Sequence, residues 1–222
     1  MPGIQRKPLL TLAKTRKEAK AFAVAESKHS EPALFGVTDG KAVGTYLEQK
    51  FQAHLRNNYS FPAGNSAKGV DFPELAVDIK VTSIKQPQSS CPFKSARQKV
   101  YGLGYSLLVF VYDKHDDPTA KTAVLNILHT IFVEPHRTAD FQATSGILKL
   151  LDNNANTDDL VAFFIERMLP LDEIAARQLA EEVLTNKPAL GYLTMSNALQ
   201  WRLQYSRVIT EAGRIDGVVR VR

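Results

Sequence analysis

The segment Ser106–Tyr112 (SLLVFVY) constrains the fold of this chain most, because every side chain after the serine is apolar or aromatic. Such a run is typical of a β-strand covered on both faces, as in the middle of a sheet with helices on either side. A second strand is expected over Ala123–Glu134, and a third, Leu75–Ile84, alternates apolar and polar residues. The longest apolar run has six residues, far short of the roughly 20 that cross a bilayer, so no membrane partner is expected.

Outside these strands, apolar residues recur at helical spacing over much of the chain. We expect helices over Lys41–Asn57, Ser95–Leu103, Asp158–Leu169, Leu171–Leu184 and Met195–Val208. The order of elements predicts an α/β fold in which a mixed central sheet is flanked by helices and followed by a helical C-terminal region. The expected division places the core in residues 1–150 and the helical region in residues 151–222.

The charge of the chain is unevenly distributed. Its 222 residues carry a net charge of +5, and the sequence pI is about 9.2. The first 20 residues hold six basic side chains and one acidic, and the last 21 hold five arginines and two acids. These ends suit a polyanionic partner, although a solvated surface gives the same pattern. The single cysteine, Cys91, excludes an internal disulfide and fits a reducing compartment such as the cytoplasm.

The segment Asp71–Lys80 (DFPELAVDIK) carries the strongest chemical signal. On a strand, Asp78 and Lys80 leave the same face, and Asp71 can fold back beside them after a proline-containing turn. Two neighbouring carboxylates repel each other unless a cation lies between them, and hard oxygen ligands suit Mg²⁺. An adjacent ammonium group completes a set able to hydrolyse phosphodiesters with a metal. The structural alternative is an amphipathic strand with a solvent-facing ion pair.

These residues resemble a known nuclease core. Asp71 followed by Asp78-x-Lys80 is similar to the PD-(D/E)XK motif. The helix Lys41–Phe51 (KAVGTYLEQKF), together with the seven-residue offset between the two acids, resembles the mismatch-repair nicking enzyme MutH and restriction endonucleases similar to it. The second acid is Asp78, where that group usually has Glu, and the final third of the chain matches no known pattern.

The resemblance implies a type II restriction endonuclease that hydrolyses double-stranded DNA at specific sequences with Mg²⁺. Such an enzyme works in the cytoplasm of a prokaryotic cell beside a cognate DNA methyltransferase. Asp71, Asp78 and the carbonyl of Ile79 would hold the metal, and Lys80 would orient or activate the attacking water. Glu48 would be a helix-borne acid at the same site. The further catalytic contributor stays open between Glu48, Gln98 and Lys99, with Lys99 the better positional match among the basic or polar residues.

Two other segments are candidates for DNA contact. Asn, Gln and Arg side chains can bind base edges, and Ser can bind phosphate. The expected C-terminal helix presents Asn197, Gln200, Arg202, Gln204 and Arg207, and the expected loop after the catalytic strand presents Gln86, Gln88, Ser89, Ser90 and Lys94. The alternative for the first set is an amphipathic helix that packs Leu199 and Leu203 into the core.

Two rival functions remain open from the sequence. One is a nuclease with the same core that nicks a single strand during repair, as MutH does. The other is a non-enzymatic helix-turn-helix regulator, in which the acid–lysine trio is only a surface ion-pair cluster. A two-fold homodimer would suit a palindromic target. Because MutH-like enzymes also act as monomers, both oligomeric states stay open.

Overall fold

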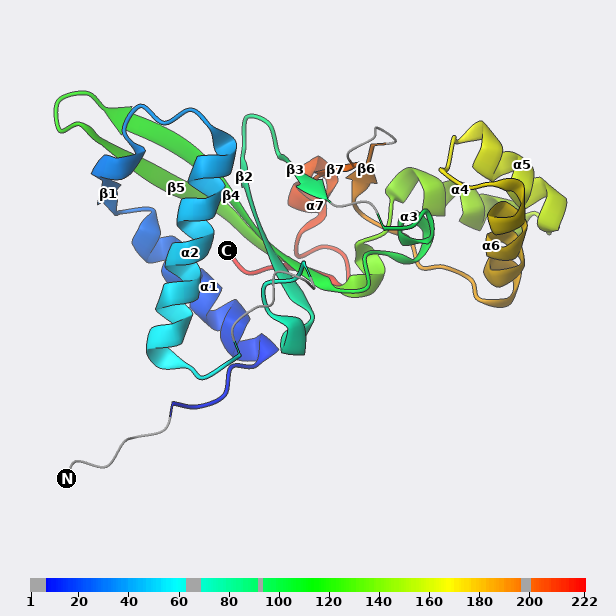
Figure 1. Cartoon of the computed structure of the whole chain (residues 1–222), viewed down its shortest axis with the longest axis horizontal. Coiled ribbons are helices and arrows are strands. Elements are labelled where there is room, and N and C mark those ends of the chain that lie inside the picture. Colours follow the sequence, from blue (N-terminus) through cyan, green and yellow to red (C-terminus); the bar gives the residue numbers. More distant parts are fainter. Residues whose placement is uncertain (1–6, 63–68, 92–93, 197–200) are drawn as a thin grey trace. The chain divides into compact units, whose positions relative to one another are not determined.

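A computed structural model describes residues 7–62, 69–91, 94–196 and 201–222 of the chain (Figure 1). Contacts divide the chain into two compact units. The first comprises Met1–Pro87, Leu107–Phe132 and Val219–Arg222, and the second comprises Gln88–Ser106 and Val133–Val218. The chain therefore passes from one unit to the other four times.

The first unit is built around a five-stranded sheet. Its strand order is β1-β5-β4-β2, and β8 also pairs with β5. The strands are β1 (Ser30–Glu31), β2 (Val77–Ser83), β4 (Ser106–Asp117), β5 (Thr122–Val133) and β8 (Val218–Arg220). All five residues of Leu107–Val111 are fully buried, which confirms the central strand predicted from the apolar run. The strand predicted around Val77 is also confirmed, although Leu75 lies in the short 3-10 helix Pro73–Leu75 before it.

Two long helices supply the apolar side chains that cover this sheet. Helix α1 (Leu12–Glu26) begins at a Thr11 cap, and α2 (Gly40–Asn58) begins at Asp39, whose side chain accepts a hydrogen bond from the backbone of Lys41. Helix α2 packs against both α1 and β2. The ring centroid of Phe51 lies 5.1 Å from that of Phe22 and 5.2 Å from that of Phe110, so aromatic contacts join both helices to β4. Helix α2 confirms the helix predicted over this region, whereas α1 was not predicted.

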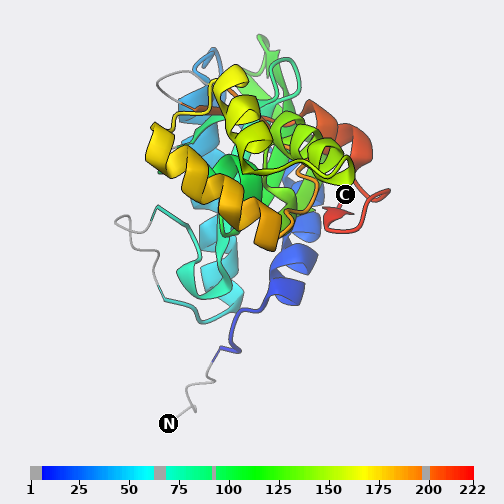
Figure 2. The same cartoon turned by 90° about the vertical axis from the view of Figure 1, so that its right-hand side faces the viewer.

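The second unit contains four helices in the described residues before the C-terminal strands. They are α3 (Arg97–Tyr101), α4 (Phe141–Asp152), α5 (Thr157–Glu166) and α6 (Glu173–Thr185), and Figure 2 shows α5 and α6 side by side. An added Cβ at Gly146 of α4 would lie 2.3 Å from the ring of Phe163, so the glycine permits the close approach of α4 and α5. The helices predicted around α3, α5 and α6 are confirmed, and α4 was not predicted.

The C-terminal part of the second unit corrects a prediction. The helix expected over Met195–Val208 is wrong: the chain there forms strands β6 (Thr194–Met195) and β7 (Trp201–Gln204), then the short helix α7 (Ser206–Glu211). The segment predicted as a loop after β2 contains strand β3 (Gln88–Cys91), which pairs with β7. Leu203 and Tyr205 are buried while Arg202 and Gln204 are exposed, so the spacing is that of a strand.

The architecture is a mixed α/β fold, as expected, and its C-terminal region contains strands as well as helices. Among the described residues, none of the helices combines the length and the apolar character that crossing a membrane requires.

Candidate active site

The position of Asp71 is set by a tight loop before β2. Phe72 and Val77 form an isolated antiparallel bridge, with hydrogen bonds of 2.9 and 3.2 Å in the two directions. The loop between them is the 3-10 helix Pro73–Leu75, followed by Ala76 in the left-handed region at φ 48°. A left-handed conformation costs a residue with a Cβ roughly 1–2 kcal/mol, so the surrounding contacts must hold it. This loop returns Asp71 to the side of β2.

Two hydrogen bonds orient the Asp71 carboxylate. The backbone N–H of Ile79 donates to Oδ2 at 2.7 Å, and the side-chain amide of Gln52 donates to Oδ1 at 3.2 Å. The carboxyl groups of Glu48 and Asp78 also lie within hydrogen-bonding reach of Asp71. Asp71 is therefore the middle member of three neighbouring carboxyl groups, supplied by α2, by the loop and by β2.

Asp78 is buried, with 4% of its surface exposed. Lys80 Nζ lies 2.5 Å from Asp78 Oδ2 and forms an ion pair with it, as the predicted same-face arrangement requires. Lys80 is thus the cationic partner of this buried oxygen, and Asp71 lies beside Asp78 as a second negative group. Buried carboxylates are costly, and a cation beside them offsets part of that cost.

Burial raises the pKa values of both aspartates. The pKa of Asp71 rises from 3.8 to about 6 because the group is removed from water and because Glu48 lies beside it. The pKa of Asp78 also rises to about 6 through burial, although the ammonium of Lys80 partly opposes that rise. A single lysine thus does not neutralise the cluster, and the excess of negative charge favours binding of a further cation.

The chemistry of this cluster fits Mg²⁺. Across residues 7–62, 69–91, 94–196 and 201–222, no group of three or more His, Cys, Asp and Glu side chains is arranged to hold a metal ion alone. A set of two carboxylates and one backbone carbonyl leaves further positions for water and phosphate oxygens. Mg²⁺ in phosphate-transferring sites is commonly held in that way, by one or two carboxylates together with water and substrate.

Two other catalytic candidates lie in the second unit. Lys99 is buried, its ammonium donates to the carbonyl of Met195 at 3.0 Å, and burial lowers its pKa although Asp140 opposes this. Gln98 donates to the carbonyl of Leu103 at 3.3 Å. Both side chains therefore have structural contacts within their own unit. Glu48 belongs to the first unit and lies beside Asp71 there.

The structure divides the candidate DNA contacts into several groups. Gln88, Ser89 and Ser90 on β3 lie beside Arg202 and Gln204 on β7, in one sheet. The remaining candidates do not join this sheet: Gln86 follows β2 in the first unit, Lys94 is exposed before α3, and Arg207 stacks its guanidinium 3.5 Å from the ring centroid of Phe141. Asn197 and Gln200 lie outside the described residues.

Gln52 is a site residue that the sequence analysis missed. It lies four residues after Glu48 on α2, so both side chains share one face of the helix. Its amide nitrogen donates to Asp71, and its amide oxygen accepts from Arg56 at 3.4 Å. The four-residue spacing from Glu48 was the available signal.

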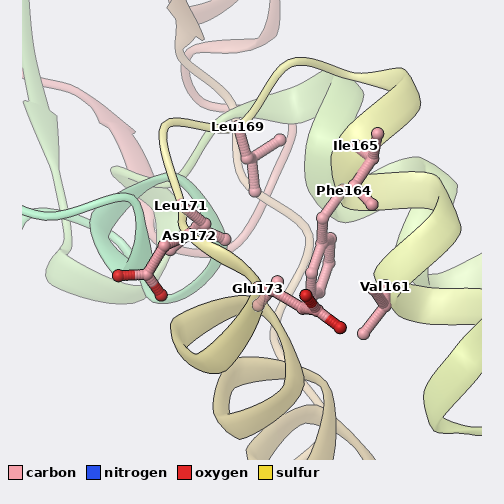
Figure 3. A pocket seen from close by; sticks show the side chains of 8 residues that line it. Val161, Phe164, Ile165, Leu169, Leu171, Asp172 and Glu173 are labelled. Carbon is pink, nitrogen blue, oxygen red and sulfur yellow. The ribbon is translucent and has the colours of Figure 1, made fainter.

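The second unit also contains a pocket of about 300 Å³ between α5 and α6 (Figure 3). Its lining is mainly apolar and includes Phe164, Leu169 and Leu171, with Asp172 and Glu173 at the start of α6. Asp172 already accepts a hydrogen bond from the backbone of Ala175 as the cap of that helix. The lining carries no pair of groups suited to acid–base or nucleophilic chemistry, so the candidate active site is the cluster around Asp71.

A carboxylate cluster with an adjacent lysine is chemically suited to phosphodiester hydrolysis with a metal ion. Comparison with known proteins identifies the class more closely. The model of the family described as "Type II restriction enzyme NspV" matches residues 9–220. The chain therefore belongs to this family of type II restriction enzymes and is a site-specific deoxyribonuclease that acts on double-stranded DNA.

A curated relative gives the same result. The type II restriction enzyme NspV of Nostoc sp. (strain ATCC 29411 / PCC 7524) is 63% identical over 213 residues, which cover 96% of this chain and 97% of the relative. No solved structure matches the chain.

Proposed function

We propose that this restriction endonuclease uses a PD-(D/E)XK site of the MutH-like kind and requires Mg²⁺. The observation that carries the proposal is the pairing of half-buried Asp71 with buried Asp78, with Lys80 in contact with Asp78. Both aspartates have a raised pKa, and Lys80 leaves the same strand face as Asp78. An ion pair that served only the fold would not need a third carboxyl group, Glu48, beside Asp71.

Each residue of the cluster has a separate task in this proposal. Asp71, Asp78 and the carbonyl of Ile79 hold the Mg²⁺, which when bound supplies a Lewis acid that stabilises charge growing on the scissile phosphate. Lys80, held as an ammonium by its ion pair with Asp78, donates a hydrogen bond to the attacking water and so orients it. Glu48 accepts a hydrogen bond from that water or from one next to it. Gln52 keeps the Asp71 oxygens in place.

The deciding experiment compares Lys80→Ala with Lys85→Ala, an exposed lysine beyond the end of the same strand. Phage or plasmid DNA is incubated with each protein in Mg²⁺ and in EDTA. Wild type and Lys85→Ala should give discrete fragments with Mg²⁺ and none with EDTA. Lys80→Ala should bind the same DNA and cut at least about 100-fold more slowly, because it lacks the group that positions the water. Cutting by Lys80→Ala at the wild-type rate would overturn the assignment.

The repair-type alternative predicts a different product from the same experiment. A restriction enzyme converts supercoiled plasmid into linear molecules, whereas a strand-nicking enzyme stops at the open circle. The regulator alternative predicts binding that is indifferent to Mg²⁺ and to the aspartates. Membership of the restriction family favours the first outcome over both.

The cellular setting follows from the proposed activity. The enzyme works in the cytoplasm of a prokaryotic cell, and a cognate DNA methyltransferase protects the host's own sites. A homodimer would match a palindromic site, since a two-fold protein presents the same surface to both half-sites. Residues 1–150 would supply catalysis, and residues 151–222 would supply recognition or dimer contacts.

A further inference from the structure

The sheet in the second unit joins two segments that are far apart in the sequence. Strands β3 and β7 are antiparallel, with Gln88 opposite Gln204 and Ser90 opposite Arg202. Strand β6 pairs with the other side of β7, and there Thr194 lies opposite Gln204. β7 is therefore the central strand of three, and its side chains have neighbours on both sides.

One face of this sheet is fixed in the core. Leu203 and Tyr205 are fully buried, and Met195 is 4% exposed. The hydroxyl groups of Ser89 and Tyr205 share a hydrogen bond of 2.6 Å, which ties β3 to the residue that follows β7. Because successive side chains of a strand alternate between faces, these contacts fix the orientation of the residues on the opposite face.

The opposite face carries polar side chains in two rows. Gln88, Gln204 and Thr194 form one row across the three strands, and Ser90 and Arg202 form the next. Side chains directly opposite each other on neighbouring strands lie roughly 5 Å apart, so each row is continuous. The strands contain no Asp or Glu, and Arg202 is their only charged residue.

Arg202 and Gln204 are exposed. The 3.0 Å hydrogen bond between Arg202 and Ser196 Oγ uses the backbone N–H of the arginine and not its guanidinium group. Exposed long polar side chains on a rigid surface suit a ligand that offers hydrogen-bonding edges. A type II restriction enzyme must distinguish one duplex sequence from all others, so it needs a surface with such side chains.

The major groove of B-DNA accepts a β-ribbon as well as a helix, and each base pair shows a distinct set of donors and acceptors there. Arginine binds the O6 and N7 atoms of guanine in a bidentate manner, and glutamine binds N6 and N7 of adenine. The described rows carry both side-chain types on adjacent positions of one face.

We propose that the solvent face of the β3–β7–β6 sheet enters the major groove and reads the target sequence, with Arg202 contacting a guanine and Gln204 an adenine. The inference deepens the proposed function by naming the surface that selects the substrate. It rests on that function only in requiring that the chain bind a specific duplex, and it is independent of the metal site.

The test first maps the cut site by sequencing fragment ends, and then measures binding of short duplexes. One duplex carries the mapped site, and others carry a single changed base pair in it. The proteins compared are wild type, Arg202→Ala, Gln204→Ala and Arg214→Ala, the last being an exposed arginine of the same unit outside the sheet. Equal melting temperatures should show that all four fold alike, because the altered side chains are exposed.

Arg202→Ala should weaken binding to the intact site by roughly 5- to 150-fold, the range for one bidentate base contact. It should also lose the wild-type preference at one G·C pair while keeping it elsewhere. Gln204→Ala should do the same at one A·T pair, and Arg214→Ala should keep every preference. Equal weakening of intact and altered duplexes would show that Arg202 contacts only phosphate, and this result would overturn the proposal, as would unchanged binding.

Failure of this inference is distinguishable from failure of the proposed catalytic site. If Lys80→Ala cuts normally while Arg202→Ala loses its preference at a G·C pair, the sheet reads DNA and the catalytic assignment is wrong. If Lys80→Ala binds but does not cut while Arg202→Ala keeps all its preferences, the catalytic assignment stands and the reading surface lies elsewhere.

Discussion

At the scale of single residues, the decisive feature is a pair of neighbouring aspartates, of which Asp78 is buried and Asp71 is half-buried. Asp78 is 4% exposed, and both members of the pair have pKa values raised to about 6. The folded chain therefore holds protons on these groups that the unfolded chain releases at lower pH. Ionisation of the two aspartates lowers the stability of the folded state, and a bound cation would offset that loss.

The sign of the pH dependence follows from the raised pKa of Asp78. The folded state binds the proton more tightly, so the stabilising contribution is present below about pH 4 and is lost as the pH rises through about 6. Asp78→Asn should therefore unfold at a higher temperature than wild type at pH 8 in EDTA, with a difference in unfolding free energy on the order of 2 kcal/mol. At pH 4 the difference should vanish. Thermal unfolding at both pH values measures it.

Addition of Mg²⁺ at pH 8 should raise the melting temperature of wild type and leave that of Asp78→Asn unchanged, since binding to the folded state stabilises it. The matched control is Glu74→Gln, an exposed acid in the loop before β2, which should behave as wild type does. An Asp78→Asn protein that gains as much from Mg²⁺ as wild type would place the metal elsewhere.

At the scale of elements, helix α2 brings two side chains to one aspartate. Glu48 and Gln52 are one helical turn apart, and both reach Asp71. The buried side of the helix, with Val43, Leu47, Phe51 and Leu55, fixes its rotation, so packing positions the polar side chains.

Gln52→Leu keeps the approximate size of the side chain and removes the amide that donates to Asp71. Residues that orient metal ligands typically contribute 10- to 100-fold to metal affinity or activity. We expect Gln52→Leu to need a Mg²⁺ concentration roughly tenfold higher for half-maximal cleavage, with little change in melting temperature. Gln52→Glu should be affected more, because it adds a fourth negative group. Titration of the cleavage rate with Mg²⁺ measures both.

Gln49→Leu is the control for Gln52, because Gln49 is exposed on the same helix. It should require the wild-type Mg²⁺ concentration. If both leucine variants shift the titration equally, the effect belongs to the helix as a whole and the positioning role of Gln52 is wrong.

Some elements and contacts of this fold were predictable from the sequence and others were not. Helix α2 and strands β2, β4 and β5 were predictable because their periodicity is local and their burial is strong. The Asp71–Asp78–Lys80 trio was predictable because all three residues lie within ten positions. The contact between Gln52 and Asp71 joins residues 19 positions apart, and the β3–β7 pairing joins residues more than 100 apart. Local patterns do not determine such pairings.

The error over Met195–Val208 has a specific cause. Leu199 and Leu203 are four residues apart, which suggested a helical stripe, but Leu203 and Tyr205 also alternate with Arg202 and Gln204. Short segments satisfy both periods at once. Pairing with β3 makes this segment a strand and not a helix, and β3 lies at the other end of the unit's sequence.

At the scale of the whole molecule, the C-terminus of the chain belongs to the first unit. Val221 donates to the carbonyl of Thr130 at 2.8 Å, and Arg222 Nη1 donates to the carbonyl of Ala23 at 2.6 Å and to Ser27 Oγ at 2.8 Å. The last residues thus join β5 to the end of α1, although the preceding 86 residues belong to the second unit.

Deletion of residues 219–222 should therefore destabilise the first unit. Loss of these hydrogen bonds and of the packing of Val219 and Val221 should cost on the order of 2 kcal/mol, which corresponds to a fall in melting temperature of roughly 4–8 °C. Arg214→Ala, which removes an exposed charge outside these contacts, should leave the melting temperature unchanged. A truncated protein as stable as the full chain would show that these contacts contribute nothing.

The four passages of the chain between its units limit how such enzymes can acquire new targets. The second unit consists of two separate stretches, Gln88–Ser106 and Val133–Val218, and the sheet that we propose reads DNA takes one strand from the first stretch and two from the second. A single recombination event between the two stretches of related genes would exchange β6 and β7 without exchanging β3, and would leave a hybrid sheet. New specificities in this family are therefore expected to arise by substitutions within an intact chain, with changes on β3 and β7 inherited together.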